Sequence, residues 1–501
     1  MKNVIVIMCD SLQFNYLGCY GNEWIKTPNF DRLAKESVVF DKAYAEGLPT
    51  VPVRRALLTG RYTLPFKGWA PLDHDDTTIT DILWHNSIQT ALITDTAPMH
   101  LPKYGYERGF DQTIFFRGQE FDHYYYDDPL VHLDPDDYHK PKMVKGEDGV
   151  EHEEIFSIFA KEELFDYLPP RQHWKDGGDQ MVGQVSKKAI EYLESVDKTK
   201  PFLLWLDSFD PHEPWDPPST YDSNLKCPYD PDYDGKPLIN PLPGFVNNLY
   251  TERELHHIRM LYAEKVTNVD TWIGKVLDRV RELGLMENTM IVFLADHGEP
   301  LGNNEHGHGI MRKCRPWPYE ELVHIPLMVK VPGVEGGKRH SSYVQTPDIA
   351  PTIMDWLGIT ERTENMQGES LLPLVREEKD KLRDFAIAGY YNFSWSIIRD
   401  DYSYIHWLRQ AKLDEDEDHS QTMIEFYDQN KGQRKKILQL EEDESVWTCT
   451  PGSEAEMPEG DELYDRKTDQ FQLNNLANDN PDLGGELLEQ LRAFMTDLRA
   501  S

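Results

Sequence analysis

The chain has 501 residues and carries 52 basic against 88 acidic side chains, a formal net charge of −36. Hydrophobic residues make up 39% and aromatic residues 11% of the chain, which is enough for a folded core and excludes a disordered composition. The acidic surplus argues against nucleic acid and against an anionic membrane as partners, because phosphate groups are bound by basic patches. The length exceeds one average domain, so a large domain with a smaller one is expected.

The cysteines and the N-terminus indicate the compartment. The cysteines are scattered without metal-ligand or disulfide spacing: Cys9, Cys19, Cys227, Cys314 and Cys449. Reduced thiols in a cytoplasmic protein fit this pattern best. The first apolar stretch is too short for a signal peptide and ends at Asp10, so it is predicted to be a buried first strand. No apolar run of about 18 residues occurs, and no membrane span is expected.

Short apolar runs at residues 4–8, 202–206 and 290–295 end abruptly in polar side chains. Continuous apolar runs of this length are typical of strands buried on both faces, as in a parallel sheet covered by helices. Helical patterns occupy residues 29–35 and 262–283, so an α/β fold is predicted. Ligands bind such sheets at the carboxyl ends of the strands. We therefore expect the residues at these ends to converge: Asp10, Asp207, Asp296 and His297.

The C-terminal part of the chain has a different pattern of apolar and aromatic residues. A helix over residues 350–357 is expected to stop at Gly358. From about residue 385, short aromatic-rich alternating runs are followed by an amphipathic helix at 483–498. We predict a large α/β domain over residues 1–384, with a central mostly parallel sheet flanked by helices. Residues 385–501 are predicted to form a small domain with an antiparallel sheet and a helix. The acidic runs at 414–418 and 441–444 are expected to be solvated loops.

Residues 49–61, P-T-V-P-V-R-R-A-L-L-T-G-R, are the most informative segment. Pro52 suits the first turn of a helix and Gly60 suits its end. Thr50 is then placed at a helix N-terminus, where free N–H groups favour an anion. Arg54 follows one turn later on the same side. Taken alone, the pattern also fits a plain threonine N-cap with a surface arginine.

A second candidate segment is A-D-H-G-E at residues 295–299. At a strand end, Asp296 and His297 can offer two ligands to one hard or borderline cation. A turn with a satisfied aspartate and an exposed histidine explains the same residues equally well. Asp10 after the first strand is also ambiguous alone, because aspartate often caps a following helix.

Segments along almost the whole chain occur in the order that one family shows. They read N-V-I-V-I-M-C-D (3–10), L-G-C-Y-G (17–21), T-P-N-F-D-R-L-A (27–34), P-x-R-x-x-L-L-T-G-R (52–61), R-G-F-D (108–111), P-H-E-P-W (211–215), Y-A-E-K-V-T-N-V-D (262–270), A-D-H-G-E (295–299), Y-E-E-L-V-H-I-P-L (319–327), D-I-A-P-T (348–352) and E-L-Y-D (462–465). In this set the chain resembles the sulfatase family of the alkaline phosphatase superfamily. The resemblance implies the two-domain fold described above.

The resemblance also implies a divalent cation. Its ligands would be Asp10, Asp296, His297 and the nucleophile at position 50, here Thr50. A mixed Asp and His set suits Mn, Mg, Ca or Zn, so the metal is left open. No convincing ligand set for a second metal is found.

Further site residues follow from the same resemblance. Arg54 would stabilise the nucleophile, while His212 and Lys313 would contact the anionic group or the leaving oxygen. Weaker substrate-binding candidates are His100, His308 and Arg117, the last with Glu120 in the same segment, F-F-R-G-Q-E. A surface-loop role fits His308 equally well.

Two departures from the family pattern bear on the reaction. The family nucleophile is a Cys or Ser that is converted to formylglycine, and a threonine cannot be oxidised to that aldehyde. Formylglycine is therefore excluded at Thr50. The family segment G-K-W-H is replaced by T-D-T-A-P-M-H at residues 94–100, so one anion-binding lysine is missing.

We therefore predict a hydrolase of phosphate esters (phosphodiester, phosphomonoester or phosphonate ester) that acts through a phospho-Thr50 intermediate, with His212 as general acid. A sulfuric ester hydrolase that works without formylglycine is the first alternative. A phosphoryl transferase and a catalytically silent module that binds anions or sulfated glycans are the others. The substrate would be a small or glycan-linked anionic ester. Its organic part is not readable from the sequence, and a homo-oligomer stays open.

Overall fold

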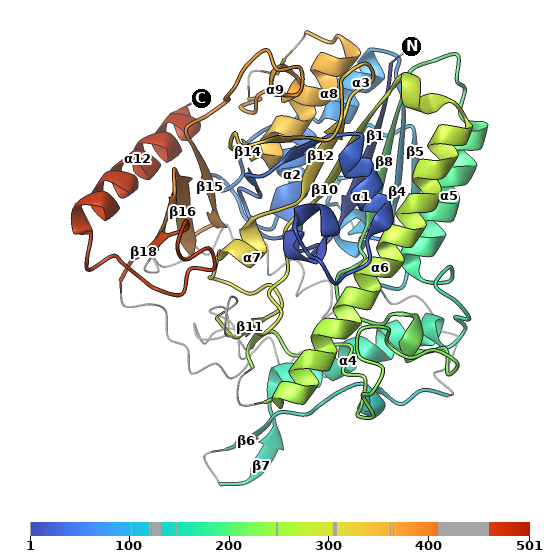
Figure 1. Cartoon of the computed structure of the whole chain (residues 1–501), viewed down its shortest axis with the longest axis vertical. Helices are drawn as coiled ribbons and strands as arrows, with labels where there is room; N and C mark the ends of the chain where they lie inside the picture. Colours follow the sequence, from blue (N-terminus) through green and yellow to red (C-terminus); the bar gives the residue numbers. More distant parts are fainter. Residues whose placement is uncertain are drawn as a thin grey trace.

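The computed structural model describes residues 2–500, except 102, 120–121, 123–131, 147–148, 247–248, 304–307, 361, 364 and 409–459. The expected loops at 414–418 and 441–444 lie outside the described residues, as do Cys449 and Glu120. Figure 1 shows a large sheet with helices on both faces and a smaller sheet beside it that carries the C-terminal helix.

The large sheet has eight strands, in the order β13-β2-β12-β10-β1-β8-β4-β5. They are β13 (Lys338–His340), β2 (Val38–Phe40), β12 (Leu327–Lys330), β10 (Thr289–Ala295), β1 (Asn3–Cys9), β8 (Phe202–Ser208), β4 (Gln89–Thr94) and β5 (Gln112–Phe115). β1 runs parallel to β10 and β8, and β4 runs parallel to β8 and β5. Only β12 is antiparallel to its neighbours, β10 and β2. The predicted mostly parallel sheet is confirmed.

Helices on the two faces bury these strands. In one layer α6 (Glu252–Glu282) contacts both α1 (Pro28–Lys35) and α5 (Met181–Ser195), while in the other α2 (Thr50–Thr59) contacts α3 (Ile79–His85) and α8 (Ile349–Leu357). α6 begins at Glu252, well before the predicted residue 262. The reason is a capping box in which Thr251 and Glu254 bond each other's main-chain N–H groups, a start signal that precedes the apolar periodicity.

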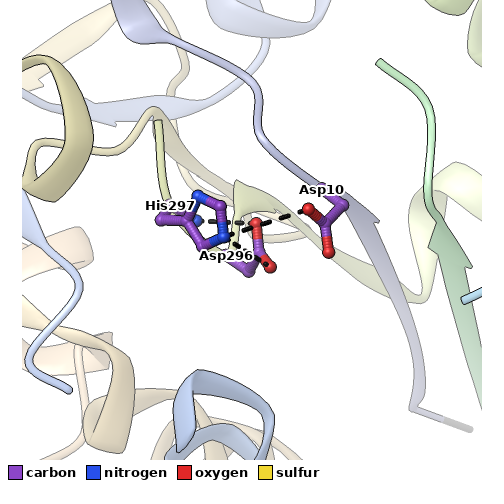
Figure 2. Close-up of side chains that lie close together, drawn as sticks. All are labelled: Asp10, Asp296 and His297. Carbon is purple, nitrogen blue, oxygen red and sulfur yellow. Dashed lines mark hydrogen bonds and ion pairs between the residues drawn. The ribbon is translucent and has the colours of Figure 1, made fainter. Parts of the chain in front are cut away.

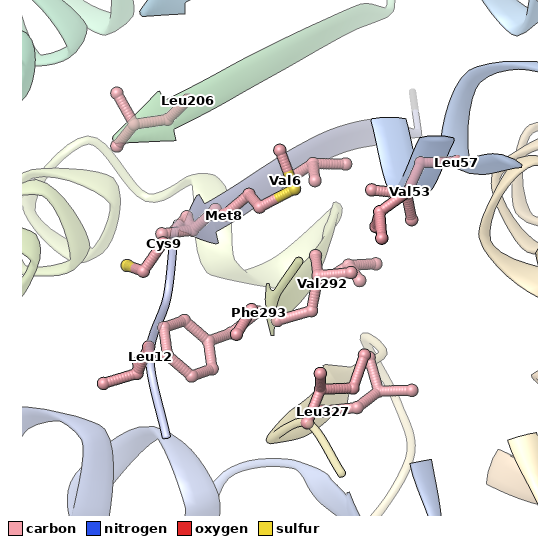
Figure 3. Close-up of a cluster of buried hydrophobic side chains, with 14 of the residues drawn as sticks. Val6, Met8, Cys9, Leu12, Val53, Leu57, Leu206, Val292, Phe293 and Leu327 are labelled. Carbon is pink, nitrogen blue, oxygen red and sulfur yellow. The ribbon is translucent and has the colours of Figure 1, made fainter. Parts of the chain in front are cut away.

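The interior of the sheet fixes the position of α2. Figure 3 shows Val53 and Leu57 of α2 facing Val6 of β1 and Val292 of β10. All four side chains are buried. Gly60 ends the helix as predicted, with a φ of 67° that favours glycine. Residues one turn apart share a helix face, so this packing also places Thr50, at the start of α2, near the strand ends.

The C-terminal sheet is antiparallel, in the order β15-β16-β17-β18. Its strands are β15 (Phe385–Tyr390), β16 (Ser394–Arg399), β17 (Tyr402–Trp407) and β18 (Glu462–Asp465), covered by α12 (Pro481–Ala500). Leu487, Leu491 and Met495 of α12 pack with Ile397 of β16 in one apolar cluster. This confirms the predicted fold class, whereas the domain boundary at residue 384 stays a prediction.

The remaining elements are short or peripheral. They are β3 (Ala43–Tyr44), β14 (Val344–Gln345), β6 (Met143–Lys145), β7 (Glu151–Glu153), β9 (Gly244–Phe245), β11 (Ile310–Met311), α4 (Ile155–Arg171), α7 (Glu320–Val323) and α9 (Leu372–Val375). Within the described ranges, none of the helices combines the length and the apolar character needed to cross a membrane.

Candidate active site

The register of the central strands brings two aspartates together. Cys9 of β1 pairs with Ala295 of β10, so Asp10 and Asp296 leave the sheet side by side. Both are fully buried, as is the adjacent His297. Figure 2 shows the three side chains pointing toward one another, and one ligand atom from each lies within 4.8 Å of the others.

Arg54 links these carboxylates to the neighbouring strand. Its Nε and Nη2 donate to the two oxygens of Asp207, over 2.8 and 2.7 Å. Its Nη1 lies 2.8 Å from Asp296 Oδ2 and 3.0 Å from Asp10 Oδ2, and it also donates to the carbonyl of Thr50 over 3.2 Å. Every guanidinium nitrogen therefore has a partner inside the protein.

The charges of this cluster do not balance. Three buried aspartates, Asp10, Asp207 and Asp296, face one arginine. Burial, followed by the charge of Asp296, raises the pKa of Asp10 to about 7, because the one nearby arginine, Arg54, offsets only part of the charge of these buried carboxylates. Two carboxylates and an imidazole are ligands for a hard or borderline divalent cation. The residues therefore fit the metal that the family resemblance implies.

Thr50 lies at the edge of this cluster, at the start of α2. Its Oγ1 is 3.3 Å from Nε2 of His297. His297 Nδ1 is 2.7 Å from the carbonyl of Gly298, and because a carbonyl only accepts, Nδ1 carries the proton. Burial lowers the pKa of His297 to about 4, so the ring is neutral and Nε2 offers a lone pair toward Thr50.

A second pair of basic residues lies close by. His212 Nδ1 is 2.6 Å from the carbonyl of Glu213, so this nitrogen also carries the ring proton. Burial holds the pKa of His212 well below its usual value, and Nε2 is left to accept a hydrogen bond from Nζ of Lys313. The charge of Lys313 acts on both ligand residues: it partly offsets the rise in the pKa of Asp10 and adds to the fall in the pKa of His297. Its ammonium is therefore within electrostatic reach of the cluster.

The weaker substrate-binding candidates have partners elsewhere. The ring of His100 lies against Phe115, with centroids 3.8 Å apart. Arg117 is exposed and pairs with Asp122. His308 stacks on Tyr319 at 3.8 Å. These recorded contacts do not connect the three residues to Thr50 and the aspartates, so their substrate-binding role stays a prediction.

Other residues at the site were not selected from the sequence as site residues. Asp207 was expected at the strand ends, but its bidentate pairing with Arg54 depends on the strand order. Thr96 Oγ1 bonds both Arg54 Nη2 and Asp207 Oδ1, at 3.3 and 3.1 Å. Glu213 and Glu299 are buried beside Lys313. In the sequence, each of these two glutamates lies in a short motif that contains a histidine. That position alone is weak evidence for a role in the site.

Comparison with known proteins decides the family. The family model described as sulfatase matches residues 2–359. The chain belongs to the sulfatase family. A second model, described as the C-terminal part of N-sulphoglucosamine sulphohydrolase, matches residues 306–443. The protein is therefore an ester-bond hydrolase of the sulfatase family.

Known relatives match most of the chain at low identity. An arylsulfatase of Clostridium perfringens is 26% identical, covering 78% of this chain and 82% of its own. An N-acetylglucosamine-6-O-sulfatase of Bacteroides thetaiotaomicron is 25% identical, covering 78% and 74%. The multifunctional alkaline phosphatase superfamily protein PehA of Trinickia caryophylli is 26% identical, covering 79% and 81%.

Solved structures of the sulfatase fold superpose on the whole chain. A protein bound to its substrate D-glucosamine-2-N,6-O-disulfate has a TM-score of 0.67 at 22% identity, covering 100% of this chain and 98% of its own. The phosphonate monoester hydrolase of Agrobacterium radiobacter has a TM-score of 0.67 at 20% identity, covering 99% and 96%. At these identities the likeness establishes the fold.

Proposed function

We propose that the protein hydrolyses phosphate esters, including diesters and phosphonate esters, with Thr50 as the nucleophile. The observation that carries this proposal is the position of the Thr50 hydroxyl, 3.3 Å from His297 Nε2 at the start of α2. Residue 50 is a threonine, which cannot become formylglycine. The substrate is a small or glycan-linked anionic ester.

Asp10, Asp296, His297 and Thr50 would hold the divalent cation. Such a cation lowers the pKa of a hydroxyl and offsets the charge of an anionic ester. Arg54 then has an organising role, because its nitrogens are already bonded to Asp10, Asp207 and Asp296. It holds the strand ends and, through the carbonyl of Thr50, the first turn of α2.

The bond changes follow from the placement of the protons. Thr50 gives its hydroxyl proton to solvent, and its oxygen attacks phosphorus, forming a Thr–O–P bond as the bond to the leaving oxygen breaks. The leaving oxygen takes a proton from the Lys313–His212 pair. Lys313 holds this proton at rest, so His212, which we expected to be the general acid, serves as its acceptor and partner. The deprotonated pair then takes a proton from water, which attacks phosphorus and releases Thr50.

Sulfate esters are the second candidate, because several relatives are named sulfatases. A formylglycine hydrate can expel sulfate by collapsing to the aldehyde. A sulfated threonine has no such route, so water would have to attack sulfur directly. This difference favours phosphorus over sulfur as the reacting centre.

A substrate panel tests the proposal. The purified protein is assayed with aryl phosphate monoesters, diesters, phosphonate esters and aryl sulfate, after supplementation with each of Mn, Mg, Ca and Zn. We expect turnover of at least one phosphorus ester, with kcat/KM for aryl sulfate clearly the lowest. A kcat/KM for aryl sulfate above the value for every phosphorus ester would overturn the proposal in favour of the second candidate.

A further inference from the structure

Glu213 is a buried carboxylate surrounded by basic side chains. It is 1% exposed and lies in the loop after β8. It forms an ion pair with Nη2 of Arg312, lies 3.3 Å from Nζ of Lys313, and has Oε2 at 3.4 Å from Nδ1 of His212. Although burial opposes ionisation, Arg312, His212 and Lys313 together hold the pKa of Glu213 well below its usual value. The side chain is therefore an anion at neutral pH.

The segment that carries Lys313 is held at several points. The main-chain N–H of Lys313 donates to Glu299 Oε1 over 2.8 Å. Arg312 has a φ of 61°, a left-handed conformation that a non-glycine residue keeps only when its surroundings enforce it. Its Nη1 donates to Asn240 Oδ1 over 3.1 Å. The adjacent cations Arg312 and Lys313 would repel each other without the anion that both contact, Glu213.

We propose that Glu213 is a positioning residue that holds the Lys313–His212 pair in its proton-donating arrangement and thereby sets the rate at which poor leaving groups depart. The proposal rests on the proposed function, in which this pair protonates the leaving oxygen. Glu213 itself does not touch the reacting atoms in this account. It orients Nζ of Lys313 toward Nε2 of His212 and keeps the Lys313 ammonium charged.

The consequence is a dependence on the leaving group. An ester with an activated aryl leaving group needs little protonation, whereas an alkyl leaving group needs a proton in the transition state. A change at Glu213 that disturbs only proton delivery therefore slows the alkyl ester far more than the aryl ester. A change that merely loosens the fold slows both by the same factor.

The experiment compares Glu213→Gln with wild type on two esters that the wild type hydrolyses. Both are esters of the same phosphorus acid, one with an activated aryl leaving group and one with an alkyl leaving group. We expect kcat for the alkyl ester to fall about 100-fold, on the scale of general acid catalysis, and kcat for the aryl ester to fall only a few-fold. Glu213→Asp keeps the charge and should recover part of the lost alkyl-ester rate. Thermal unfolding of both variants checks that they fold.

Glu264→Gln is the matched control. Glu264 is another buried carboxylate, on α6, and bonds Ser219. We expect this variant to change both esters by the same small factor. Equal losses for the two esters in Glu213→Gln, or no recovery in Glu213→Asp, would overturn the inference while leaving the proposed function standing. A wild type that hydrolyses neither ester overturns the proposed function and this inference with it.

Discussion

Thr50 Oγ1 and His297 Nε2 lie 3.3 Å apart, although 247 positions separate them in the sequence. Each comes to this point by a separate route. α2 packs Val53 and Leu57 on the sheet and so directs Thr50 to the strand ends (Figure 3). His297 follows β10 and Asp296 directly. A hydroxyl that faces a neutral imidazole beside two carboxylates is the arrangement on which the proposed chemistry depends.

Removing the Thr50 hydroxyl should abolish catalysis and leave the fold intact. We expect Thr50→Ala to lower kcat/KM at least about a thousandfold, the scale on which nucleophile deletions act. Thr59→Ala is the control, since Thr59 is buried at the other end of α2, where its hydroxyl donates to the carbonyl of Arg55 and accepts from the main-chain N–H of Arg61. Steady-state kinetics of both variants on the best phosphorus ester measure the effect. Comparable losses in the two variants would argue against a special role for Thr50.

Arg54 should contribute strongly to stability because it is buried among three carboxylates. We expect Arg54→Met to lower the free energy of unfolding by about 3–5 kcal/mol, since it leaves buried charges uncompensated. Arg32→Met removes an exposed pair with Asp278 and should cost about 1 kcal/mol or less. Urea unfolding with a chelator present measures both. An Arg54 effect no larger than the Arg32 effect would contradict the described network.

Divalent metal should stabilise the native state through the cluster. A cation that binds only the folded protein raises the free energy of unfolding by about 2.7 kcal/mol at about 100 times its Kd. We expect Asp10→Asn and Asp296→Asn to lose this metal-dependent increase. Asp270→Asn should retain it, because Asp270 is a buried carboxylate that bonds the start of α1. Thermal unfolding with and without metal decides the outcome, and an equal increase in all three variants would contradict the assigned ligands.

Glu462 should make stability depend on pH in a defined direction. Burial, followed by the charge of Asp461, raises the pKa of Glu462 from 4.5 to about 7. The stabilising contribution of its protonated form is therefore complete below about 4.5 and is lost as the pH rises through about 7.

The neutral variant Glu462→Gln lacks this pH dependence. Relative to wild type, its free energy of unfolding should rise between pH 5 and pH 8. Urea unfolding of both proteins across this range measures the difference, and a constant offset between them would show that Glu462 titrates normally.

Some of the site could be predicted because it follows from sheet geometry. Asp10, Asp296 and His297 converge since the ends of adjacent parallel strands share one edge, and each follows an apolar run in the sequence. The bidentate pairing of Arg54 with Asp207 could not be predicted in the same way. It requires β8 to lie next to β1, and strand order is not encoded in any local pattern. The contact of Glu213 with Arg312 and Lys313 joins two loops whose approach depends on the whole fold.

The most direct test of the central claim is mass spectrometry of the peptide that contains Thr50, after rapid acid quench of the enzyme during turnover of a phosphate ester. We predict a phosphoryl group on Thr50 that appears in the quenched wild type and is absent when substrate is omitted. A phosphoryl group on a different residue, or an unmodified Thr50 under conditions in which product forms in a burst, would contradict the account.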